Sequence, residues 1–149
     1  MTPRRPSAAS ALCDFAARAG HVIVLGTRKW DWKGLCDVSV PESRPFSRVF
    51  PHVGANHPIL AGIAPEWLKR WNGLPGTVAV AKIEGPAVEA GSPLLWAVEP
   101  KTTVVAEVPA AEGGGKVLFC QLDLRNHVSP GPTAYDPVAE RILLNLLAW

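Results

Sequence analysis

Apolar residues first recur at helical spacing and then form a continuous run near the start of the chain. Ser7 or Ser10 suits the N-terminal cap of a helix, and Gly20 suits its end. The apolar face of this helix consists of Leu12, Phe15, Ala16 and Ala19. Residues 21–26 then read His-Val-Ile-Val-Leu-Gly, which is typical of a strand buried on both faces. Helix and strand make half of a βαβ crossover, so we expect a domain truncated at its N-terminus, which either lacks its preceding strand or is a fragment of a longer protein.

Short apolar runs bounded by glycine and proline fill the second half of the chain. Residues 78–83, 94–98 and 102–108 each predict a strand. The glycine-rich stretch 110–115 predicts a turn that leads into a further strand at 116–124. The last two strands should therefore form an antiparallel hairpin. Glycines 113–115 do not predict a phosphate-binding loop, because Lys116 is followed by a strand rather than by a helix.

The end of the chain predicts an amphipathic helix. Asp136 is a suitable N-terminal cap, and Pro137 suits the first helical position. One wide face carries Val138, Ala139, Ile142, Leu143, Leu146 and Trp149. Helices alternating with short apolar strands predict one domain over residues 1–149, a three-layer α/β sandwich. We expect a mostly parallel sheet, with the antiparallel hairpin near its C-terminus.

Composition excludes several classes of protein. The 149 residues carry a net charge of only +2, which does not favour nucleic-acid binding. No apolar stretch is long enough for a membrane span or for the core of a signal peptide. Three cysteines without a CxxC pair predict neither a disulfide framework nor a zinc site. We therefore expect a cytoplasmic protein that uses no metal and no cofactor.

The cysteines lack the local setting of a catalytic nucleophile. A nucleophile elbow places its residue on a sharp strand-to-helix turn between small residues. Cys120 lies between Phe119 and Gln121, inside a predicted strand, and Cys36 follows a glycine turn without forming an elbow. Buried structural thiols are the simpler interpretation.

Two other groups of residues are candidates for ligand binding. Asp123, Asn126 and His127 follow the strand at 116–124, and ligand crevices of open α/β sheets lie beyond the carboxyl ends of parallel strands. A solvated polar loop is the simpler interpretation of this group. Trp30 and Trp32, two residues apart in a glycine-bounded loop, would suit a platform for stacking a sugar.

Several motifs together resemble a known family. They are residues 57–62 (His-Pro-Ile-Leu-Ala-Gly), 67–73, 114–124 (Gly-Gly-Lys-Val-Leu-Phe-Cys-Gln-Leu-Asp-Leu), 136–139 and 143–147. This pattern resembles the glutamine-amidotransferase-like domain found at the C-terminal end of family 2 and β-galactosidase-type glycoside hydrolases. The resemblance covers roughly the last hundred residues.

The resemblance implies a flavodoxin-like α/β sandwich and an accessory role. Such domains lack the amidotransferase cysteine and pack against other domains or subunits of a carbohydrate-active enzyme. The expected role is packing, oligomerisation, including association of identical chains, or shaping of a neighbouring site. Two alternatives remain open: a cysteine-dependent hydrolase that uses Cys36 or Cys120 with His57 or His127, and a sugar-binding module that uses Trp30 and Trp32.

Overall fold

A computed structural model describes residues 8–149 except 28, 33, 73–75, 100 and 129–133. The strands are β1 (His21–Leu25), β2 (Trp30–Asp31), β3 (Ser39–Val40), β4 (Phe50–Pro51), β5 (Ser92–Trp96), β6 (Thr103–Pro109) and β7 (Lys116–Cys120). The α-helices are α1 (Ala8–Ala17), α2 (Pro86–Ala90), α3 (Leu124–His127) and α4 (Pro137–Ala148). Two 3-10 helices are η1 (Pro58–Leu60) and η2 (Pro65–Lys69).

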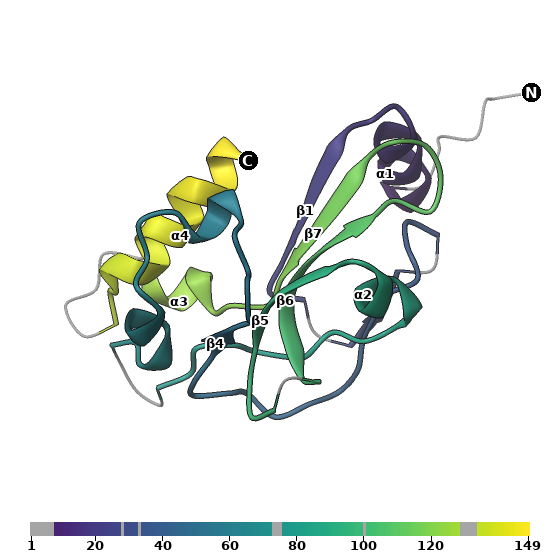
Figure 1. Cartoon of the computed structure of the whole chain (residues 1–149). Coiled ribbons are helices and arrows are strands. Elements are labelled where there is room, and N and C mark those ends of the chain that lie inside the picture. Colours follow the sequence, from purple (N-terminus) through teal and green to yellow (C-terminus); the bar gives the residue numbers. More distant parts are fainter. Residues whose placement is uncertain (1–7, 28, 33, 73–75, 100, 129–133) are drawn as a thin grey trace, which may run out of the picture.

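The main sheet has five strands in the order β1-β7-β6-β5-β4 (Figure 1). Only the β1–β7 pair is parallel, and the other three pairs are antiparallel. The prediction of a mostly parallel, three-layer flavodoxin-like sandwich is therefore wrong. A parallel sheet needs a long crossover between successive strands. Here β5, β6 and β7 follow one another through turns, and α2, η1 and η2 are too short to serve as crossover helices.

The predicted hairpin is confirmed. β6 and β7 pair antiparallel, with Val105 opposite Cys120 and Pro109 opposite Lys116. The glycines of its turn lie against the end of α1, where a Cβ on Gly113 or Gly115 would collide with backbone carbonyl oxygens of Ala17 and Ala16. Glycine is therefore needed in this turn for close packing.

Two other predicted strands differ from the structure. The strand expected at 116–124 ends at Cys120, after which the chain turns into α3. Residues 78–83 form no extended strand, because Ala79 makes only isolated bridges with Phe46 and Leu122. Local apolar runs indicate burial, whereas a strand also requires a continuous neighbour to receive its hydrogen bonds.

Alternate residues of the central strands enter two cores on opposite faces of the sheet. Leu118 and Cys120 belong to the first core, and Val117 and Phe119 belong to the second. The first, here the α4-side core, also contains Val105, Ala139, Ile142 and Leu146. The second, here the α1-side core, also contains Ala16, Val22, Val24 and Cys36. Figure 1 shows α4 on one side of the sheet and α1 and α2 on the other.

The C-terminal helix matches its sequence pattern. The Asp136 carboxylate accepts a hydrogen bond from the backbone N–H of Val138 at 2.8 Å and so caps α4. It also accepts one from the backbone N–H of Asn72 at 3.0 Å, which ties the helix to a distant loop. Ala139, Ile142 and Leu146 are buried against the sheet, whereas Leu144 and Leu147 are exposed.

Candidate functional site

A crevice opens at the carboxyl ends of the parallel pair β1 and β7. Its volume is about 650 Å³. Its walls are Leu25, Gly26, Val80, Leu122, Asp123, Leu124, Arg125, Asn126, Val128 and Leu143. Most of these residues are of apolar type, and the polar side chains come from the segment that leads into and through α3. The position corresponds to the ligand crevice of open α/β sheets, although only one strand pair here is parallel.

The structure brings Asp123, Asn126 and His127 together around α3. The Asn126 side-chain amide donates to both carboxylate oxygens of Asp123, at 2.8 and 3.0 Å. His127 Nδ1 lies 2.7 Å from the backbone carbonyl oxygen of Asp123, so this nitrogen carries the proton and donates. His127 Nδ1 is 3.9 Å from the nearer Asp123 carboxylate oxygen, too far for a hydrogen bond.

Asp123 and Asn126 line the crevice, whereas His127 does not. The His127 ring is buried and meets the edge of Trp71, with ring centroids 5.1 Å apart. The crevice thus offers one carboxylate–amide pair that can bind a hydroxyl group. Within the described residues its lining has no second carboxylate and no imidazole for general acid–base chemistry, and no group of three or more metal-ligating side chains occurs.

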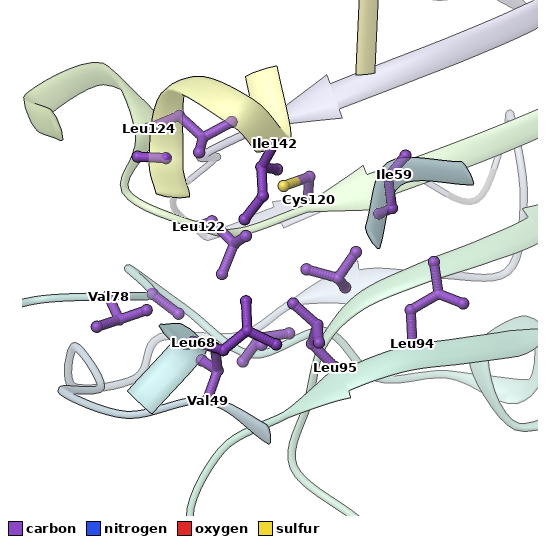
Figure 2. Close-up of a cluster of buried hydrophobic side chains, with 14 of the residues drawn as sticks. Val49, Ile59, Leu68, Val78, Leu94, Leu95, Cys120, Leu122, Leu124 and Ile142 are labelled. Carbon is purple, nitrogen blue, oxygen red and sulfur yellow. The ribbon is translucent and has the colours of Figure 1, made fainter. Parts of the chain in front are cut away.

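The two cysteines considered as nucleophiles are buried on opposite faces of the sheet. Cys120 ends β7 in the α4-side core, and Figure 2 shows its sulfur beside Ile142 of α4. Cys36 lies in the α1-side core. Burial raises the pKa of the Cys120 thiol to about 12, although a hydrogen bond from the Leu122 backbone opposes this change. Burial, with the charges of Asp37 and Cys13 adding to it, likewise raises the pKa of Cys36 to about 12.

These pKa values oppose nucleophilic chemistry, because the reactive species is the thiolate. No hydrogen bond joins Cys36 or Cys120 to an imidazole in the part of the chain that the structure describes. Cys120 also stands at a strand end rather than mid-strand as predicted. The chain does turn toward a helix here, but only after three further buried residues, so the sulfur remains inside the core.

His57 forms a second polar cluster that the sequence did not reveal. Its Nε2 lies 2.9 Å from Glu107 Oε2 on β6, and its Nδ1 accepts a hydrogen bond from the backbone N–H of Ile59 at 3.3 Å. Because Nδ1 accepts, we assign the ring proton to Nε2, which donates to Glu107. Both nitrogens are then in use, and His57 has no free nitrogen to act as a base.

Lys116 completes this cluster. Its ammonium group lies 2.8 Å from Glu107 Oε1, so the carboxylate joins η1, β6 and β7. Burial raises the pKa of Glu107, but the hydrogen bonds and charges of Lys116 and His57 outweigh burial and lower it overall. Sequence did contain a signal for Glu107, because it is the only charged residue in the run 103–108. Its partner could not be identified, since His57 lies 50 residues away.

Of the two tryptophans predicted to form a sugar-stacking platform, only the side chain of Trp32 lies in the described structure. Trp32 is half-buried against the α1-side core, and its ring meets Phe119 edge-on with centroids 5.9 Å apart. The backbone of Trp30 belongs to β2 and lies opposite Val40, but its side chain is outside the described part of the chain. Much of the Trp32 side chain therefore packs against the core.

Comparison with known proteins found no match. Protein-family models, curated proteins and solved structures were each searched, and none matches this chain. Among the described residues, no helix is both long and apolar enough to cross a lipid bilayer.

Proposed function

We propose that this chain is a non-catalytic accessory domain of a carbohydrate-active enzyme, acting by packing against other domains or subunits. The proposal rests on one observation: the most reactive side chains of the chain are buried or hydrogen-bonded within the protein, where they stabilise the fold. Both nitrogens of His57 bind the protein itself, and the thiols of Cys36 and Cys120 are buried. Side chains committed in this way are not available to a substrate.

The motifs behind the resemblance to glycoside-hydrolase accessory domains have structural tasks here. Residues 57–62 include η1, which His57 attaches to the sheet through Glu107. The glycines near 114 fit the turn of β6 and β7 against α1, and Asp136 caps α4. This supports an origin in a domain whose sequence maintains packing rather than chemistry.

Two measurements test the proposal. The purified chain should hydrolyse neither glutamine nor nitrophenyl glycosides. When an affinity-tagged chain is purified from its source cells, a nitrophenyl β-glycosidase activity should elute with it and not with the tag alone. Turnover of either substrate by the isolated chain would contradict the non-catalytic role. Absence of glycosidase activity from the eluate would contradict the proposed partner.

The crevice supports a second candidate function, the binding of a small hydroxylated ligand. Its volume of about 650 Å³ is within the usual range for small-molecule sites, and Asp123 and Asn126 present polar groups to it. Calorimetric titration with monosaccharides tests this function. Binding that Asp123→Ala removes and that Trp32→Phe leaves intact would favour the crevice over the tryptophan loop. If no sugar binds, this second function is excluded for the sugars tested.

A further inference from the structure

We infer that the open edge of β1 pairs with the same strand of a second copy of this chain, forming a two-fold dimer with one continuous sheet. The inference specifies a partner for the packing role proposed above and rests on it. It is carried by the hydrogen-bonding geometry of β1 and by an apolar flank of α4 beside that strand.

The outer edge of β1 has no strand beside it in the described structure. β1 ends the five-stranded order and pairs with β7 alone. The carbonyl of Gly20 accepts from Lys116, and the N–H of Gly26 donates to Cys120, so even-numbered residues direct their backbone groups toward β7. Because these directions alternate in a parallel ladder, the N–H and C=O groups of His21, Ile23 and Leu25 face away from the sheet.

This edge lacks the features that normally prevent strand pairing. Protective edges carry charged residues, proline or bulges, or are very short. β1 reads His-Val-Ile-Val-Leu, contains no proline, lysine or acid, and keeps regular register with β7 along its five residues. Leu25 at its end is 46% exposed. An open, uncharged edge of this kind is a template for another strand.

The strand is complementary to itself under a two-fold rotation. With the axis at Ile23, antiparallel pairing places Ile23 opposite its own copy and His21 opposite Leu25 of the other chain. The three residues with outward backbone groups then face one another, and each such pair can exchange two hydrogen bonds. His21 meets leucine rather than a second histidine, so self-pairing brings no like charges together.

The same rotation joins an apolar flank of α4 to its copy. One flank of α4 lies beside the end of β1, because Leu143 shares the crevice wall with Leu25. On its other side, Asn145 donates to the carbonyls of Ile59 and Ala61, which attaches that flank to η1.

Leu147 follows Leu143 by one helical turn and therefore lies on the β1 side of α4. It is 75% exposed. In the dimer, two copies of this flank face each other beside the joined strands, and burial of Leu147 and its copy adds an apolar contact to the strand pairing. A second copy satisfies both the strand edge and the leucine flank with one symmetry operation.

Sedimentation velocity over a range of concentrations tests the dimer. The chain should sediment as a dimer at micromolar concentration. Leu25→Lys and Leu147→Asp should each weaken association by roughly tenfold or more, because each puts a charge into the buried contact. Val53→Asp is the matched control, since Val53 is fully exposed in a turn beside β4 at the other edge of the sheet, and it should leave association unchanged.

Residue-resolved amide hydrogen exchange identifies the strand. In the dimer the amides of Ile23 and Leu25 should be protected, and in Leu147→Asp they should exchange rapidly. The amides of Val22 and Val24 should stay protected in both proteins because they bond to β7, which also shows that the variant is folded.

Three results would overturn the inference: a monomer at all accessible concentrations, a dimer that both charged variants leave intact, or free exchange at Ile23 and Leu25 in the dimer. Binding of a different protein along this edge, without self-association, would also overturn it while leaving the accessory role standing. Turnover of glutamine or a glycoside would instead contradict the accessory role and would not change the sedimentation result.

Discussion

Replacing Glu107 by glutamine tests the polar contact that attaches η1 to the sheet. The carboxylate is 15% exposed and accepts from His57 at 2.9 Å and from Lys116 at 2.8 Å. Glutamine has nearly the same shape, so its oxygen can still accept from His57, but the charge is lost. A hydrogen bond to a charged group contributes about 1 kcal/mol more than a neutral one. The half-exposed Lys116 pair adds about 0.2–1 kcal/mol. We expect Glu107→Gln to lower the free energy of unfolding by about 1–2 kcal/mol.

The pH dependence of this loss has a definite sign. The pKa of Glu107 in the folded protein lies below its ordinary value of 4.5, because the hydrogen bonds and charges of Lys116 and His57 outweigh burial. A carboxyl group with a lowered folded pKa stabilises the protein above its unfolded pKa, and this contribution is lost as pH falls through the folded pKa. The difference between the wild-type protein and Glu107→Gln should therefore be full near neutral pH and should shrink as pH falls below 4.5.

Urea unfolding followed by tryptophan fluorescence measures both effects. Lys116→Met is the matched control, because it removes only the half-exposed ion pair and should cost about 0.2–1 kcal/mol. The reasoning fails if Glu107→Gln is as stable as the wild-type protein near neutral pH, or if Lys116→Met costs as much as Glu107→Gln. A difference between wild-type and Glu107→Gln that grows on acidification would show that the pKa of Glu107 is raised by folding.

Three further predictions follow from the buried groups. With pKa values of about 12, Cys36 and Cys120 should react with iodoacetamide near neutral pH far more slowly than half-exposed Cys13, and all three should react in urea; rapid labelling of Cys120 in the folded protein would contradict its burial. Asp136→Ala should lower the free energy of unfolding by about 2–3 kcal/mol, since a cap and a second backbone hydrogen bond are lost, whereas Asp136→Asn should cost less. Ile142→Ala should cost about 2–5 kcal/mol in urea unfolding because the side chain is fully buried, and a loss well under 1 kcal/mol would show that the site is loosely packed.

The residues of the candidate crevice could be predicted only in part from the sequence. Asp123, Asn126 and His127 are close along the chain, so their proximity around α3 follows from local spacing, but the burial of His127 against Trp71 depends on a contact between distant segments. The interpretation of Cys120 as a structural thiol rested on missing small neighbours, and its placement mid-strand was wrong. After Cys120, Gln121 still donates to the Val104 carbonyl, but its own carbonyl accepts from Val80 and Leu122 bridges to Ala79. The end of the strand therefore depends on a distant segment, which the sequence of β7 does not encode.

Elements with local signals could be predicted from the sequence alone. Asp136, Pro137 and the apolar residues of α4 are close together in the sequence. The glycine turn connects β6 to β7, the next strand along the chain. Strand order, strand direction and the hydrogen bond between His57 and Glu107 could be seen only in the tertiary structure. Those features depend on hydrogen bonds between segments far apart in sequence, and a short apolar run carries the same pattern whichever neighbour it meets. The same apolar runs therefore fit a mostly parallel sheet equally well. The structure instead has antiparallel hairpins and a single parallel pair in its main sheet.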